Sequence, residues 1–241
     1  MQITLTSADE LSPTQIGALQ TLMQQAGFAV DGAYLQNVHL AHSPTIVMAH
    51  RDGQLLGFQT YNLYRIQTPF FKGKIPFVFG GLAFQDNQLA GRGLSYRMSR
   101  FYMQQTLGRL FFLRRYAFAI CTPTPRLIQI MSVQHQLIHF RNGLLTPAIV
   151  QFAQQFMRDV RRVNDPIDDQ LVVHGKPVEA DITATWATSF RASKDDYNKM
   201  AFDAGIIRQK GDQFLLTGNY LLLLGRTSAL HMVQSFRKFR K

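Results

Sequence analysis

The most constraining stretch of this 241-residue sequence is residues 74–107, where a strand pattern, a glycine-rich turn and a helix pattern follow one another. Ile75 to Phe84 is a short apolar run rich in aromatic and β-branched residues, which predicts a buried strand. Its two internal glycines predict a bulge or a close approach by another group. From Leu94, apolar residues recur at helical spacing. A strand that enters a helix through glycines directs backbone N–H groups outward at the positive end of the helix dipole, an arrangement that binds anions.

The turn reads Gln88-Leu89-Ala90-Gly91-Arg92-Gly93, and in this setting it resembles the Q/R-x-x-G-x-G/A signature of the Gcn5-related N-acetyltransferases, the GNAT superfamily. The resemblance implies an α+β fold with a mixed central sheet flanked by helices. It also implies that the turn amides hold the pyrophosphate of coenzyme A, while amides of the fourth strand polarise the thioester carbonyl. The cofactor-binding residues implied in this way are Leu82, Ala83, Phe84, Gln88, Leu89, Ala90, Gly91, Arg92, Gly93, Leu94 and Thr124.

The glycine-rich turn has one alternative interpretation that stays open and two that the sequence excludes. A glycine-rich connection that binds nothing is the structural alternative. A dinucleotide-binding fingerprint is excluded because Tyr96 stands where its third glycine belongs, and no G-x-x-x-x-G-K-[ST] P-loop occurs in the sequence.

The charge distribution points to an anionic partner. The formal net charge is +11, and from Gly53 to Arg158 the only carboxylate is Asp86, against twelve Lys and Arg residues. This segment contains the glycine turn, so we expect a polyanion such as coenzyme A, nucleic acid or an anionic lipid surface. Charge alone does not choose among them. The tail, residues 231–241, places four basic residues around two phenylalanines, which fits either a frayed terminus or a contact with an anionic surface.

Cysteine and histidine usage predicts no metal site. Cys121 is the single cysteine, which excludes an internal disulfide or a cysteine-based metal cluster, and the histidine pairs lack further ligands nearby. The sequence has no apolar run of membrane-spanning length and no N-terminal signal pattern. We therefore expect a cytoplasmic protein, with a peripheral membrane contact as the variant that the basic tail suggests.

We expect one domain over residues 1–241, in which residues 146–192 are an insertion before the last two strands. Asp52-Gly53 predicts a hairpin turn, and Thr124 with Pro125 predicts the start of a helix. The segment 182–190 is expected as a strand or an irregular connection. The expected strands are 1–7, 45–49, 55–66, 75–84, 115–121 and 171–173, and then 212–216 and 220–224, which we expect to pair as a hairpin.

The catalytic side chains are less clear than the cofactor site. In the GNAT family an Asn lies near the start of the helix after the fifth strand, and often a Tyr one turn further on. Here those positions are Thr124 and Met131, so the usual general acid is missing. Tyr61 and Cys121 are the candidates for proton donor or relay. The alternatives are a packed sheet tyrosine and an inert small hydrophobe, and a covalent role for Cys121 lacks an evident activating partner.

Together these features predict an N-acyltransferase that moves an acetyl or other short acyl group directly from acetyl-CoA, or another acyl-CoA, to an amine acceptor. The acceptor, whether small molecule or protein, is not identified by the sequence. One alternative is a non-catalytic basic module of the same fold that binds nucleic acid or an anionic membrane surface. Another is a long-chain N-acyltransferase, if Phe77, Phe79 or Phe84 line an open acyl channel.

Overall fold

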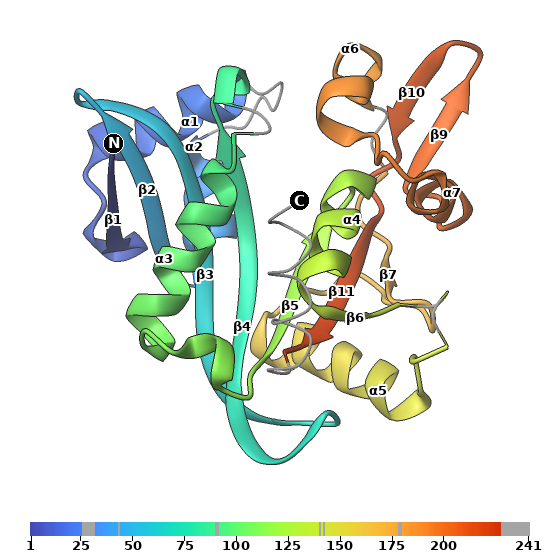
Figure 1. The fold of residues 1–241 in the computed structure, drawn as a ribbon. Coiled ribbons are helices and arrows are strands. Elements are labelled where there is room, and N and C mark those ends of the chain that lie inside the picture. The colour runs from blue at the N-terminus through green and yellow to red at the C-terminus, as the bar shows by residue number, and fades with distance from the viewer. Residues whose placement is uncertain are drawn as a thin grey trace. The chain divides into compact units, whose positions relative to one another are not determined.

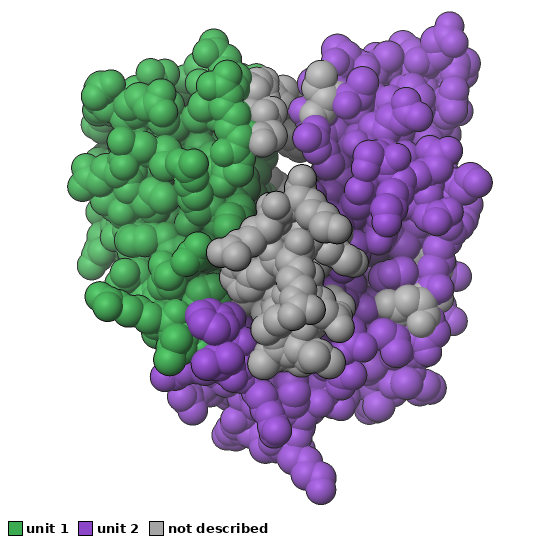
Figure 2. Space-filling model, viewed as in Figure 1, with its two compact units in different colours: residues 1–64, 78–111 green, residues 65–77, 112–241 purple. Residues whose placement is uncertain are grey.

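The computed structural model describes residues 1–25, 32–42, 44–89, 92–139, 141, 143–177 and 180–227. The chain divides into two compact units (Figure 2). Unit 1 comprises residues 1–64 and 78–111, and unit 2 comprises residues 65–77 and 112–241. Two long strands, β3 (Gln54–Thr68) and β4 (Phe71–Gln85), contribute residues to both units. Ala90, Gly91 and the tail 231–241, for which the sequence made predictions, lie outside the described residues.

The sheet of unit 1 is antiparallel in its first strands. β1 (Gln2–Ser7) pairs with β2 (Thr45–Arg51), and β2 pairs with β3. Arg51 lies opposite Gln54 across a two-residue turn in which Asp52 and Gly53 have φ of 52° and 79°. Left-handed φ at both central residues is the requirement of a tight hairpin turn, so the predicted hairpin is confirmed.

Helices cover both faces of this sheet (Figure 1). α1 (Pro13–Gln25) starts with a capping box, in which Ser12 Oγ accepts from the Gln15 amide and Gln15 Oε1 accepts from the Ser12 amide. Its buried side chains join α2 (Gly32–Tyr34) and η2 (Leu35–Leu40) in a core with β2 and β3. The buried residues of this core are Leu19, Leu22, Met23, Leu35, Leu40, Ile46, Met48 and Phe58.

The other face carries α3 (Leu94–Leu107), which packs against β1 and β2. Its residues Leu94 and Met98 are buried. A Cβ added at Gly57 on β3 would lie 3.2 Å from both of these side chains and 3.1 Å from the Phe84 carbonyl. Glycine at this position therefore lets the start of α3 come close to the sheet.

In unit 2 the central strand is β11 (Tyr220–Arg226), which pairs antiparallel with β5 (Ala117–Thr122), β6 (Gln136–Ile138) and β7 (Val172–Val173). Leu221, Leu222, Leu223 and Leu224 are at most 1% exposed. A strand buried on both faces is expected to be a continuous apolar run, and this one is.

A second sheet in unit 2 has the order β8-β10-β9, with β8 at Ala180–Asp181, β9 at Ile207–Lys210 and β10 at Gln213–Leu216. Trp186 stacks on Phe214 of this sheet, with ring centroids 4.5 Å apart. The helical segments of unit 2 are η4 (Phe111–Leu113, its first residue in unit 1), α4 (Pro125–Gln134), α5 (Pro147–Gln155), η5 (Phe156–Val160), α6 (Thr183–Thr185), η6 (Trp186–Phe190) and α7 (Asp195–Asp203).

The predicted α+β class is confirmed, since helices flank β-sheet in the described residues. Two local predictions are wrong. Residues 182–190 are mostly helical, as α6 and η6, and the strands 212–216 and 220–224 do not pair with each other. β10 instead forms a hairpin with β9, because Lys210 lies opposite Gln213 across the two-residue turn Gly211-Asp212.

Candidate functional site

The start of α3 has the features of an anion-binding site, which we call the anion seat and which comprises Gly93, Leu94 and Ser95. Gly93 is its N-cap residue, in the left-handed conformation with φ 74° and ψ 15°, and no side chain caps the helix there. The Arg97 amide makes a helical bond to the Gly93 carbonyl at 3.1 Å. The amides of Leu94 and Ser95, in the first turn, have no hydrogen-bond partner among the described residues. They lie at the positive end of a 14-residue helix, where an anion is stabilised.

The turn before the helix is ordered by its own hydrogen bonds. The Gln88 amide donates to Asp86 Oδ1 at 2.8 Å, the Leu89 amide to the Asp86 carbonyl at 2.9 Å, and the Arg92 amide to the Leu89 carbonyl at 3.1 Å. These three amides, which the resemblance assigned to the cofactor, are engaged within the turn. A pyrophosphate would therefore rest on the amides that follow Arg92. Ala90 and Gly91, assigned with them, lie outside the described residues.

Side chains tie the helix start to the end of β4. Ser95 Oγ donates to Gln85 Oε1 at 2.9 Å, and Gln85 Nε2 donates to the Leu89 carbonyl at 3.4 Å. One glutamine thus bridges the helix and the turn. Arg92 and Arg97 are both exposed beside this start and add positive charge to it.

The C-terminal part of β4 is bonded to Thr60 of β3. Thr60 is buried, and its Oγ1 accepts a hydrogen bond from the Leu82 amide at 2.8 Å. The neighbouring Gly81 leaves room for that hydroxyl, because a Cβ at Gly81 would lie 2.3 Å from Thr60 Oγ1. The resemblance gives the amides of Leu82 to Phe84 the task of polarising a thioester carbonyl. In this structure the first of them is already engaged by Thr60.

Tyr61 belongs to a triangle of polar side chains that the sequence did not predict. Its hydroxyl donates to Gln59 Oε1 at 2.7 Å and lies 2.8 Å from Ser99 Oγ, and Ser99 Oγ also donates to Gln59 at 3.1 Å. The ring stacks on Tyr102 with centroids 4.2 Å apart. Burial raises the pKa of Tyr61 above its ordinary value, so the phenol stays protonated at neutral pH. It could therefore serve as a proton donor and not as a base, after giving up its bond to Gln59.

The two predicted residues of unit 2 have different environments. Cys121 lies on β5 opposite Leu222, and burial raises the pKa of its thiol from 9.0 to about 12 although the residue keeps some exposed surface. Such a thiol is protonated at neutral pH and is a poor nucleophile. Thr124 is the N-cap residue of α4, as predicted, but its side chain makes no capping hydrogen bond.

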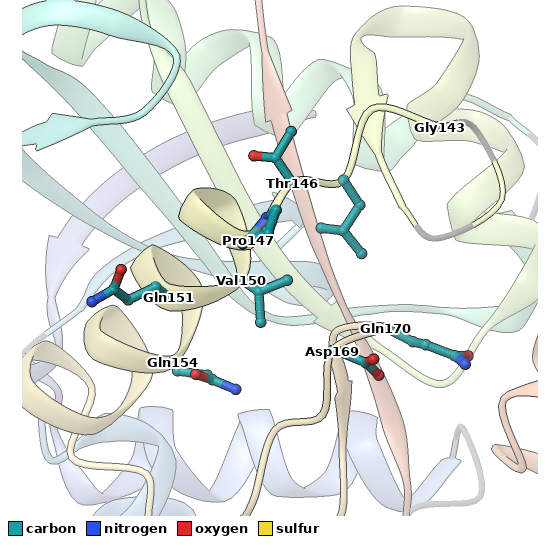
Figure 3. A pocket seen from close by; sticks show the side chains of 9 residues that line it. Gly143, Thr146, Pro147, Val150, Gln151, Gln154, Asp169 and Gln170 are labelled. Atoms are coloured by element: carbon teal, nitrogen blue, oxygen red, sulfur yellow. The ribbon is translucent and has the colours of Figure 1, made fainter.

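A pocket of about 540 Å³ lies beside the start of α5 in unit 2 (Figure 3). Thr146, Gln151 and Gln154 line it from one side, and Asp169 and Gln170 from the other. Its one charged side chain is a carboxylate, so the pocket does not suit an anionic cofactor such as coenzyme A. The start of α3 fits that group better.

Comparison with known proteins gave structural similarity only. No family model matches the sequence, and no curated protein matches it. Among solved structures, an acyl-CoA N-acyltransferase from Pseudomonas aeruginosa is 17% identical, with a TM-score of 0.39 over 57% of this chain and 88% of that chain. Arabidopsis thaliana NAA60 in complex with acetyl-CoA is 14% identical, with a TM-score of 0.37 over 59% and 93%. A putative acetyltransferase of the GNAT family from Desulfovibrio desulfuricans is 12% identical, with a TM-score of 0.38 over 95% and 99%. At this level of similarity we base the functional proposal on the chain's own residues.

Proposed function

We propose that the protein binds an acyl-CoA at the start of α3 and transfers its acyl group to an amine acceptor. The observation that carries this proposal is the left-handed Gly93 N-cap, which leaves the amides of Leu94 and Ser95 without a partner in the described residues. The sequence signature around it and the carboxylate-poor segment 53–158 support the same cofactor. Pyrophosphate is an anion that this geometry suits.

The chemistry proposed is direct transfer. The lone pair of a neutral amine attacks the thioester carbonyl carbon, the C–S bond breaks, the amine nitrogen loses one proton to solvent as it becomes an amide, and the departing thiolate takes up a proton. The amine is neutral either because water removes the proton of its ammonium form or because the acceptor's pKa is already low. Tyr61 can supply a proton only by leaving Gln59, and the Leu82 amide can polarise the carbonyl only by leaving Thr60.

We propose an acetyl or other short acyl group because the candidate channel residues are occupied by packing. Phe77 has no exposed surface, and its ring lies 4.8 Å from Phe156 and 5.6 Å from Phe152. Phe84 stacks on Phe58 at 5.7 Å. Comparing the affinities of acetyl-, octanoyl- and palmitoyl-CoA below their micelle concentrations tests this. A long acyl chain buried in a channel would add about 0.8 kcal/mol per methylene, so a monotonic rise in affinity with chain length would overturn the short-chain assignment.

Calorimetric titration with coenzyme A tests the seat itself. Gly93→Val places a β-branched residue at a left-handed position and should weaken binding by about tenfold or more, because the strained turn no longer directs its amides correctly. Gly73→Val is the matched control, since Gly73 has φ of 79°, an open surrounding and a place at the other end of β4. Unchanged affinity in Gly93→Val would exclude the seat, and equal losses in both variants would indicate a general effect on folding.

A second candidate function is a module that binds the cofactor without turnover. The engaged Tyr61 hydroxyl and the raised pKa of Cys121 favour it, because the Tyr61 proton is bonded to Gln59 and a thiol with a raised pKa is a weaker proton donor. The two functions differ in one measurement. Release of free coenzyme A thiol from acetyl-CoA in the presence of an amine panel, with acylated product seen by mass spectrometry, supports transfer, and tight binding without release supports the module.

A further inference from the structure

The turn after α3 exposes two large apolar side chains. Residues 108–115 read Gly-Arg-Leu-Phe-Phe-Leu-Arg-Arg, and we refer to them as the arginine–leucine turn. Leu110 is 59% exposed and Leu113 is 57% exposed, while Phe111 between them is buried at 8%. These are the highest exposures recorded for large hydrophobic residues in the described part of the chain. Phe111 therefore anchors the turn and the two leucines point outward.

The local geometry places the leucines together. The Phe111 amide donates to the Gly108 carbonyl at 3.0 Å, and residues 111–113 form the short helix η4 of 3₁₀ type. Leu110 directly precedes η4 and Leu113 ends it, so the two exposed leucines are only three residues apart along the chain. The result is a small apolar tip on one continuous piece of chain.

The charges around this tip are all positive. Arg109, Arg114 and Arg115 are exposed, and no ion pair in the described residues involves them. The sequence has no carboxylate between Asp86 and Arg158. A turn with apolar tip and basic rim is complementary to an anionic surface that has an apolar interior.

Coenzyme A bound at the anion seat does not explain why the turn carries these arginines. Arg109, which is in the same unit as that site, follows the far end of α3, whose 14 residues span roughly 21 Å at about 1.5 Å per residue. Exposed charges are screened over about 8 Å at physiological ionic strength. The charge of Arg109 therefore contributes little to binding at the start of the helix, and the turn calls for a partner of its own.

We propose that the arginine–leucine turn is a docking site for an anionic lipid bilayer. The leucines enter the outer part of the bilayer and the arginines contact acidic headgroups, a mode that does not depend on a spanning helix. None of the described helices is long and apolar enough to cross a membrane. Nucleic acid would use the arginines and leave two leucines in water. A stable protein interface buries roughly 800 Å² per partner, more than one short turn provides.

The test is co-sedimentation of the full chain with lipid vesicles. Phosphatidylcholine vesicles are compared with vesicles that contain 30% phosphatidylserine, at about 150 mM salt. We expect binding to the anionic vesicles only. Each arginine near such a surface contributes about fivefold to partitioning, so Arg114→Gln/Arg115→Gln should weaken binding about 25-fold. Leu110→Ser/Leu113→Ser should weaken it about tenfold or more, because apolar area no longer leaves water.

Matched controls keep the test specific. Leu63→Ser removes another exposed leucine, 42% exposed, and Lys72→Gln/Lys74→Gln removes two exposed charges on β4. These variants should bind as the wild type does, and thermal unfolding checks that every variant is folded. Because each variant keeps the basic tail, binding that is unchanged in both turn variants would place the contact elsewhere and overturn the proposal.

Two further outcomes would also overturn it. The first is absence of wild-type binding to anionic vesicles. The second is a nucleic-acid site in place of a lipid site. In that case the Arg114→Gln/Arg115→Gln variant loses binding to an oligonucleotide, the Leu110→Ser/Leu113→Ser variant keeps it, and the leucine variant binds anionic vesicles as the wild type does. The proposal does not depend on acyl transfer, since neither measurement involves coenzyme A.

Discussion

The reactivity of Cys121 is the sharpest quantitative consequence of the structure. Burial raises the pKa of its thiol from 9.0 to about 12, and the positive charge of Arg161 partly opposes that rise. Only the thiolate reacts with alkylating agents. At pH 7 a shift of three units lowers the thiolate population about a thousandfold, so iodoacetamide should modify the native protein about a thousand times more slowly than the unfolded chain.

The pH profile separates this effect from simple lack of access. Alkylation measured by intact-protein mass spectrometry should level off near pH 9 in guanidinium chloride, and should keep rising tenfold per pH unit toward pH 12 in the native protein. The stability consequence has a definite sign. Below pH 9 the thiol is protonated in both states, and above pH 9 the unfolded thiol ionises first, so this residue's contribution to stability is lost between about pH 9 and 12.

Arg161→Gln provides an internal check. Removing the nearby positive charge should raise the pKa of Cys121 further and slow alkylation at every pH, provided that the variant stays folded. A native alkylation rate equal to the unfolded rate, with a plateau near pH 9, would refute the assignment of a protonated thiol. It would also reopen covalent catalysis, which a trapped acyl-thioester on Cys121 would establish.

Three further substitutions test the packing and the site. Gly225→Ala should destabilise the fold by about 1–3 kcal/mol in denaturant unfolding, because its Cβ would lie 2.2 Å from the buried Phe118 ring, and an unchanged midpoint would show that the ring moves freely. Asn198→Ala should cost about 2–4 kcal/mol, because it leaves the buried Ala192 amide and carbonyl, now bonded at 2.8 and 3.0 Å, without partners. Tyr61→Phe should lower stability by about 1 kcal/mol and keep kcat within about tenfold, whereas a loss of about a hundredfold or more in kcat would assign Tyr61 as the general acid.

Local signals in the sequence predicted most of the elements in unit 1. The Asp52-Gly53 turn and the helix that begins at Leu94 each depend on residues a few positions apart, and the structure has both. Such features are set by backbone conformation and short-range hydrogen bonds. They do not require knowledge of the rest of the chain.

Unit 2 was harder to predict because pairing there is decided at long range. The segments 212–216 and 220–224 are both strands, yet the residues between them are tied back to the end of α7. Thr217 Oγ1 donates to the Gly205 carbonyl at 2.6 Å, and the Thr217 amide donates to the Ile206 carbonyl at 3.1 Å. These bonds hold β10 beside β9 and release β11 to the larger sheet. A hairpin pattern alone does not contain that information.

In the candidate site, too, features set by neighbouring residues are predictable and contacts between distant residues are not. Strand alternation predicts that Gln59 and Tyr61 share a face of β3, but not that Ser99, 38 residues beyond Tyr61, completes their hydrogen-bonded triangle. Helix propensity predicts where α3 starts. It does not predict that Gln85 fastens that start to the strand through Ser95. Contacts between elements, and hence the arrangement of a site, depend on packing that a single sequence does not encode locally.

Glycines show what a single sequence does not predict, because this residue type serves two different purposes at Gly93 and Gly81 that the sequence does not distinguish. Gly93 provides a left-handed conformation, with φ of 74° and no atom within 4 Å of an added Cβ. Gly81 provides room, since an added Cβ would meet the Thr60 hydroxyl that holds the Leu82 amide. Replacing Gly93 therefore strains the turn that would bind the cofactor, whereas replacing Gly81 displaces Thr60 and frees the strand amide. If the strand amides polarise the substrate carbonyl, the two replacements should separate cofactor binding from the transfer step.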